Sequence, residues 1–175
     1  MNNSDSPMNI DDVTYISLTI PVLIILAFVP YFMQVLFTYM YKKTWNNVNP
    51  TVLFSIIKDE AKGGNEYAQR IVRCRACHRN CWEDLIVWNI TVTIAYIFGV
   101  NRTLILILTS FHLAARVLYI PVYIFIGHKW ISILRNLLFW FALISALVLL
   151  FYVIIDYKDD WIYDDLLDEA EEVIT

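Results

Sequence analysis

Several features common in soluble enzymes are missing from this chain. Glycine and proline are scarce, with four and five residues in a chain of 175. No glycine-rich phosphate loop, dinucleotide-binding fingerprint or nucleophile elbow is present. Lysine and arginine (13) are outnumbered by aspartate and glutamate (17), which argues against a nucleic-acid partner. The sequence therefore offers no motif of nucleotide-dependent or serine-hydrolase chemistry.

Cysteine is equally scarce. The three cysteines, Cys74, Cys77 and Cys81, fall on one predicted helix, which is a poor framework for disulfides. With His78 they form a set of metal-ligand types on one helical face. Structural zinc sites, however, draw ligands from more than one element, and the sequence has no second cluster. We expect packing cysteines and no metal site.

What the chain has in abundance is apolar sequence: 59% of its residues are hydrophobic, and its mean hydropathy is +0.55. This predicts a small helical membrane protein with one bundle. The first twelve residues are polar and acidic and lack the basic region of a signal peptide, so we expect the first apolar run to be retained. We expect three parts: a lumenal segment 1–12, a four-helix domain 13–155 and an acidic tail 156–175.

Four apolar runs are candidates for membrane spans, each of which needs roughly 20 residues. Three runs are long enough alone. The second qualifies if its helix begins near Gln69 and turns its polar residues into the bundle. The runs are Val13–Met40, Leu85–Val100, Leu104–Ile126 and Ile131–Ile155.

Basic residues predict the orientation. The segment 41–68, expected to be a loop, carries four lysines, and Gly63-Gly64 marks a break before the next helix. The short loop near His128 and Lys129 lies on the same side in a four-span topology. The positive-inside rule then places both loops in the cytosol and both termini in the lumen.

Three arginines, Arg79, Arg116 and Arg135, lie inside or at the edge of these runs. A guanidinium in hydrocarbon is costly and persists where it pairs, faces a bundle interior or serves a function. In the predicted topology all three fall in the cytosolic half of the membrane. This convergence predicts an intramembrane site for an anionic ligand.

The neighbours of each arginine extend this hypothesis. Arg79 and Glu83 are an i, i+4 pair beside Asn80, a mixture suited to a zwitterionic peptide, although charges at a helix end also snorkel without any ligand. Arg116 shares a helical face with Tyr119 and Tyr123; the alternative is a structural arginine satisfied by Glu83 or by backbone carbonyls. Arg135 is followed by Asn136, and Phe139 continues its face.

The segments 75–83 (RACHRNCWE) and 114–123 (AARVLYIPVY), together with Arg135, resemble the membrane-associated proteins in eicosanoid and glutathione metabolism, the MAPEG family. That family includes microsomal glutathione transferases, leukotriene C4 synthase and microsomal prostaglandin E synthase. The resemblance covers about 70–155. It implies an all-α integral membrane four-helix bundle that forms a homotrimer in the endoplasmic reticulum, with glutathione bound between neighbouring subunits.

The resemblance also implies residue roles. Arg135 matches the arginine that stabilises the glutathione thiolate and is the predicted catalytic residue. Ala76 departs from the family pattern, which has an arginine there, and Phe139 stands where some members have tyrosine. The predicted glutathione-binding residues are Arg79, Asn80, Glu83, Arg116, Tyr119, Tyr123 and Asn136.

A cation beside the thiol sulfur favours the thiolate, which then attacks an electrophile dissolved in the bilayer. The first hypothesis is therefore a glutathione-dependent transferase, isomerase or peroxidase acting on lipophilic electrophiles or eicosanoid-type lipids. The second is a non-catalytic lipid-binding or scaffold member of the same fold. The third is an unrelated four-span bundle whose arginines form structural ion pairs.

Overall fold

The structure is a computed structural model that describes residues 10–43, 49–127 and 132–174, with side chains over 17–43, 49–127 and 132–155. Within these ranges every regular element is a helix, as predicted. His128 and Lys129 of the second basic loop lie outside the described residues. The helices are α1 (Ile10–Lys42), α2 (Pro50–Lys62), α3 (Glu66–Ile97), α4 (Arg102–Phe125) and α5 (Ser132–Ile174).

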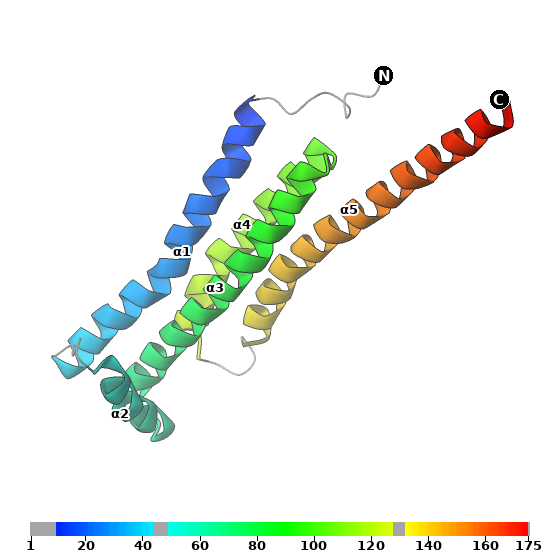
Figure 1. Ribbon diagram of the computed structural model, residues 1–175. Helices are drawn as coiled ribbons and strands as arrows, with labels where there is room; N and C mark the ends of the chain where they lie inside the picture. Colours follow the sequence, from blue (N-terminus) through cyan, green and yellow to red (C-terminus); the bar gives the residue numbers. More distant parts are fainter. Residues whose placement is uncertain (1–9, 44–48, 128–131, 175) are drawn as a thin grey trace.

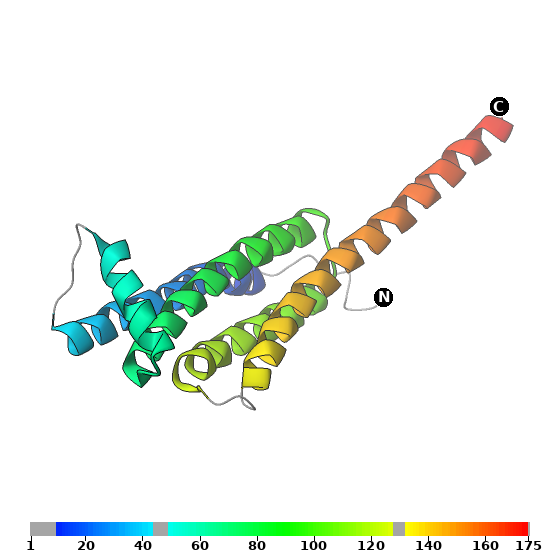
Figure 2. The ribbon, with the colours of Figure 1, turned by 90° about the horizontal axis from the view of Figure 1, so that it is seen from below.

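Four long helices run up and down beside one another, and the short α2 lies across one end (Figure 1). That end, the α2 end, also contains the last turns of α1 and α4 and the first turns of α3 and α5. The described helix ends that flank the two predicted loops therefore lie at the same end of the bundle. α5 diverges from the other helices toward its C-terminus in both ribbon views (Figure 2).

The segment 41–68 is not simply a loop, because it contains α2. Pro50 opens this helix at a position where its missing N–H costs nothing, and Ile57 packs its inner face onto Ala68 and Ile71 of α3. The predicted break at Gly63-Gly64 is confirmed: Gly64 has a φ of +94°, and the Asn65 side chain then caps α3 by accepting from the Ala68 N–H at 3.1 Å.

Small buried side chains let the helices approach closely. Ala95, Ala142 and Ala146 are at most 3% exposed, and Ala95 and Ala146 belong to one core cluster with larger residues such as Trp88. Close backbone approach is the usual basis of helix packing in lipid, where no hydrophobic effect drives helices together. Large apolar side chains such as Phe32 instead cover the outside of the bundle and remain largely exposed.

Three segments are long and apolar enough to span a membrane: Ser17–Lys42, Arg102–Phe125 and Ser132–Ile155. With 32 residues, α3 is about 48 Å long and would reach across a bilayer, but it is not among the helices that are apolar enough to qualify by composition. The fourth span and the homotrimer therefore stay predictions. α5 continues without a break past Ile155 to Ile174, through the predicted acidic tail.

Candidate functional site

The exposed flank of α3 has the predicted Arg79–Glu83 pair. Arg79 Nε lies 3.6 Å from the Glu83 carboxylate, and the two side chains are 74% and 65% exposed. The i, i+4 spacing alone dictates this contact. Both groups are therefore open to a ligand or a neighbouring chain.

Asn80 turns toward α4. Its Nδ2 donates a hydrogen bond to the Tyr119 hydroxyl at 2.9 Å, and the Tyr119 ring lies 5.3 Å from the Tyr123 ring, centroid to centroid. Tyr119 is only 1% exposed, whereas Asn80 and Tyr123 are half-buried. The structure thus brings together three of the predicted glutathione-binding residues and places Tyr119 behind the other two.

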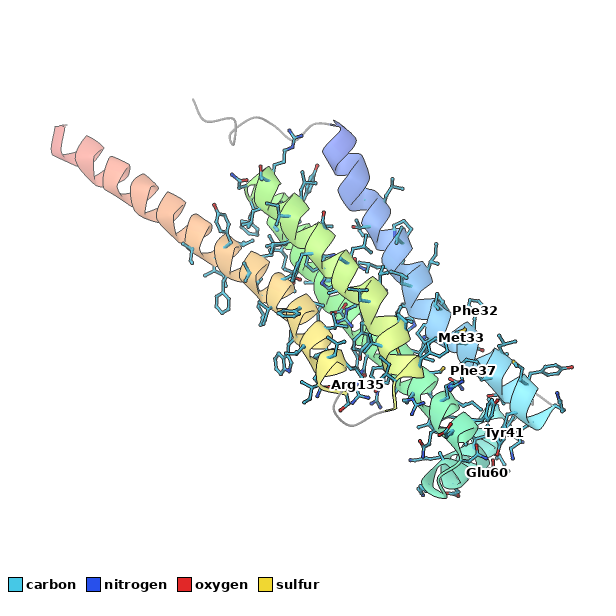
Figure 3. All side chains as sticks on the ribbon, turned by 180° about the vertical axis from the view of Figure 1, so that it is seen from behind. Phe32, Met33, Phe37, Tyr41, Glu60 and Arg135 are labelled. Atoms are coloured by element: carbon cyan, nitrogen blue, oxygen red, sulfur yellow. The ribbon has the colours of Figure 1, made fainter. Side chains whose placement is uncertain are left out.

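Arg135 completes this group from α5. Its guanidinium carbon lies 4.5 Å from the centroid of the Tyr123 ring, close enough for a cation–π interaction. Figure 3 shows Arg135 at the α2 end of the bundle, the end where Tyr41 and Glu60 also lie. Asn136 is exposed on the next position of the helix. The predicted catalytic residue is therefore next to a predicted binding residue.

A further arginine, Arg73, belongs to this region and was not among the predicted site residues. Its Nε donates to the Ile124 carbonyl at 3.1 Å, in the last turn of α4. Tyr123 lies within electrostatic range of Arg135, Arg79 and Arg73. Sequence reasoning did not single out Arg73, because nothing in its local sequence shows that α4 ends beside it. Three guanidinium groups make this a positively charged region.

Arg116 lies elsewhere. It is only 2% exposed, and its guanidinium forms an ion pair with Asp84 of α3. The predicted alternative partner, Glu83, is wrong, because consecutive helical residues point about 100° apart and Glu83 lies on the exposed flank. Asp84 follows Asn80 by four residues and so shares the flank that faces α4. This partner was overlooked in the sequence.

The same carboxylate contacts a histidine. His112 Nε2 lies 3.1 Å from Asp84 Oδ2, and its Nδ1 lies 3.2 Å from Ser145 Oγ. Serine, histidine and aspartate are the side chains of a hydrolase triad, but here all three are buried and Ser145 donates to the Ala142 carbonyl at 2.6 Å. No substrate reaches Ser145 in this arrangement, so the cluster is not a nucleophilic site.

The opposite flank of α3 borders two hollows, of about 370 Å³ and 470 Å³, that share Phe54, Arg75 and His78. The Arg75 guanidinium carbon lies 4.0 Å from the Phe54 ring centroid. Ala76, where the family pattern has an arginine, lines the larger hollow with Lys58 and Arg79. The site thus lacks one arginine but retains other cations around that position.

The three cysteines are free and buried, as predicted for packing residues. Cys74 and Cys77 are fully covered and Cys81 is 6% exposed. Among the described residues no group of histidine, cysteine, aspartate and glutamate side chains is arranged to hold a metal ion.

Comparison with known proteins gives one match. A family model described as the MAPEG family matches residues 13–155. No curated protein and no solved structure matches the chain.

Proposed function

The chain belongs to the MAPEG family, and from that premise we propose that it is a membrane-bound glutathione-dependent enzyme that acts on lipophilic substrates. The family includes glutathione transferases and related proteins as well as non-catalytic members. Membership excludes the third hypothesis, an unrelated bundle. One element of that hypothesis survives, because Arg116 does form a buried ion pair.

The observation that carries the proposal is the position of Arg135. It lies against Tyr123, and Arg73 and Arg79 are close enough to affect the same phenol. A free thiol has a pKa near 8.5 and is mostly protonated at neutral pH. A fixed guanidinium beside the sulfur stabilises the thiolate, the more so where lipid excludes water. Arg135 is accordingly the residue we assign to thiolate activation.

The accessible polar side chains match the charged ends of the tripeptide. Arg79 supplies a planar fork of donors for a carboxylate, and Glu83 supplies an acceptor for the ammonium group. Asn80, Tyr123 and Asn136 add neutral hydrogen-bonding groups on the same side. The electrophile, which we propose to be an eicosanoid-type or other lipophilic molecule, reaches the thiolate from the surrounding lipid.

The two flanks of α3 support a subunit arrangement. One flank, with α4 and α5, has Asn80, Tyr123 and Arg135; the other, with α1 and α2, has the hollows around Arg75 and His78. A head-to-tail contact that closes into a ring brings different flanks of successive copies together. We propose a homotrimer in the endoplasmic reticulum membrane, with α3 as fourth span, the α2 end cytosolic and glutathione between subunits.

The proposal is tested by the absorbance of glutathione thiolate on the purified trimer. We expect a thiolate signal at neutral pH that Arg135→Ala abolishes. Arg102→Ala, an identical change at the opposite end of the bundle, is the matched control and should leave the signal unchanged. Absence of a signal in the parent protein contradicts thiolate activation.

The alternative is a non-catalytic lipid-binding or scaffold role in the same family. Ala76 favours it, because a lost arginine weakens the hold on glutathione. A protein that binds lipophilic ligands but shows no thiolate and no turnover with a generic electrophile, a hydroperoxide or an endoperoxide supports this alternative.

A further inference from the structure

We propose that Asp84 and His112 are positioning residues for the glutathione site: they hold Arg116 in the bundle interior, where it supports the Tyr119–Asn80 pair. The inference rests on the proposed function. It also gives Arg116 a different role from the one predicted from sequence, since Arg116 acts on the ligand through Tyr119 and not by contact.

The first step is the bridge made by Asp84. Its two oxygens serve two residues of α4 one turn apart, with Oδ1 on Arg116 and Oδ2 3.1 Å from His112 Nε2. The His112–Asp84 contact is close, but its geometry is not that of a hydrogen bond. On its other side His112 lies 3.2 Å from Ser145 Oγ and from the Ala142 carbonyl of α5. One buried carboxylate thus ties α3 to α4, and His112 extends the link to α5.

The second step is the setting of Arg116. Its guanidinium carbon lies 5.1 Å from the Tyr119 ring centroid and 5.5 Å from that of Phe139. Its Nε and Nη1 have no hydrogen-bond partner among the described residues. At 2% exposure, Arg116 has no path to a ligand outside the bundle. The Arg116 guanidinium instead lies against the buried ring of Tyr119.

The third step leads from Tyr119 to the ligand side. The Tyr119 hydroxyl accepts from Asn80 Nδ2 at 2.9 Å. This contact fixes which way the amide of Asn80 faces and leaves its carbonyl oxygen and its second N–H for a ligand. Asn80 is half-buried and adjoins the exposed Arg79. A contact path therefore runs from Asp84 through Arg116 and Tyr119 to Asn80.

Loss of the Asp84 charge has a defined consequence. A guanidinium without a counter-ion in an apolar interior moves toward water or another anion. Arg116 then leaves its place behind Tyr119, and the amide of Asn80 loses its orientation. Arg135, on the next helix, keeps its contact with Tyr123. We therefore expect weaker glutathione binding with little change in the activated step.

The experiment is a double-mutant cycle on the full-length trimer with a generic electrophile as second substrate. We expect Asp84→Asn and Tyr119→Phe each to raise the KM for glutathione roughly tenfold and to change kcat less than about twofold. Because both changes break the same path, the double variant should be no worse than the poorer single variant. Asp59→Asn, the same chemical change on the exposed surface of α2, is the control.

A role in folding alone gives another pattern: a lower fraction of active protein, hence lower apparent kcat, with KM unchanged. That pattern, or fully additive KM effects in the double variant, overturns the inference. If Asp84→Asn does not fold, Asp84→Asn with Arg116→Gln removes both charges and keeps hydrogen-bonding groups; it should show the same rise in KM, and an unchanged KM overturns the inference.

The two proposals fail separately. A parent protein without a thiolate signal and without glutathione binding refutes the proposed function, and the inference falls with it. A parent protein with both properties, whose KM does not respond to Asp84→Asn, refutes the inference and leaves the proposed function intact.

Discussion

Two polar regions share α3, α4 and α5, and they satisfy their charges in opposite ways. In the interior cluster, formed by Asp84, His112 and Arg116, every member is at most 8% exposed and the charges meet one another. In the surface region, the Arg79–Glu83 pair and the half-buried Arg135 adjoin open space. Arginine is the central residue in both.

The difference lies in what happens when a partner is removed. A buried charge pays a large desolvation cost that only its partner offsets, so the interior cluster is sensitive to the loss of any member. The Arg79–Glu83 pair lies outside the packed interior of the subunit, so removing one partner leaves no buried charge and costs the fold little. The interior cluster therefore belongs to the fold, and the surface region is free to serve a ligand.

The largest effect should come from Arg116→Leu, which strands Asp84 in the interior. We expect the free energy of unfolding to fall by about 3–5 kcal/mol. Denaturant titration in detergent measures this. Arg79→Leu, the same change in the surface region, should lower it by about 0.5 kcal/mol or less. Equal losses for the two variants would remove the distinction between the regions.

Next in size is the effect of Arg135→Ala on catalysis. We expect kcat/KM with glutathione to fall on the order of 100-fold, because a cation that stabilises developing negative charge is lost. Arg135→Lys keeps a positive charge and should lose less. Steady-state kinetics with a generic electrophile distinguishes the variants, and an unchanged rate for Arg135→Ala would argue that the surface region is not catalytic.

Tyr119→Phe tests the boundary between the regions. It removes the hydroxyl that accepts from Asn80 and should lower the free energy of unfolding by about 1 kcal/mol. Tyr123→Phe, in the half-buried position, should have a smaller effect on stability. The measurement is again denaturant unfolding. A larger loss of unfolding free energy for Tyr123→Phe than for Tyr119→Phe would mean that the interior contacts extend one turn further along α4, to Tyr123.

The smallest effect concerns α2. The hydrogen bond from Lys42, with a smaller contribution from Tyr41, holds the pKa of Glu60 below its ordinary value of 4.5. Because the pKa of Glu60 is lower in the folded protein than in the unfolded chain, the contact with Lys42 stabilises the docked α2 above pH 4.5. This stabilisation is lost as the pH falls through the pKa that Glu60 has in the folded protein. Hydrogen exchange of 50–62 should therefore be constant from pH 7 to 5, after correction for intrinsic rates, and increase in stronger acid.

Glu60→Gln is the control, since it removes the titrating group. At pH 6 the corrected exchange of 50–62 should be faster in Glu60→Gln than in the parent protein. On acidification the variant should show no further increase from this contact, because it has no Glu60 carboxylate to protonate. A parent profile identical to that of Glu60→Gln would show that the Lys42 contact does not hold α2.

The contacts that the sequence predicted are those within one helix or set by its periodicity. The Arg79–Glu83 pair follows from spacing, and the shared face of Tyr119 and Tyr123 follows from the helical repeat. Contacts between helices depend on the rotation of each helix about its axis. For this reason Asp84 was missed beside Glu83, and Arg73 was missed beside the end of α4.

Three of the four predicted runs are long and apolar enough to span a membrane alone, whereas α3 was predicted as a span only if its polar residues turn into the bundle. The helix has a marked polar flank because it provides Asn80 and Asp84 to the interior. α2 was missed for a related reason: its 13 residues are too few and too mixed to give a strong periodic pattern. Elements that serve as a platform for polar contacts are thus the hardest to find from apolar periodicity.

The polarity of α3 has a consequence for how the protein is made. α3 falls short of the apolar composition of a membrane span, whereas segments of α1 and α4 reach it. Among the described residues, the arginine that pairs with Asp84 is Arg116, 32 residues later in synthesis, and Arg116 in turn depends on Asp84. If α3 crosses the membrane, as we propose, the free-energy cost of placing it in the bilayer is lowest when α4 enters with it. On that proposal neither helix has its interior charge neutralised alone, and entry of the two as a pair joins the Asp84 carboxylate to the Arg116 guanidinium.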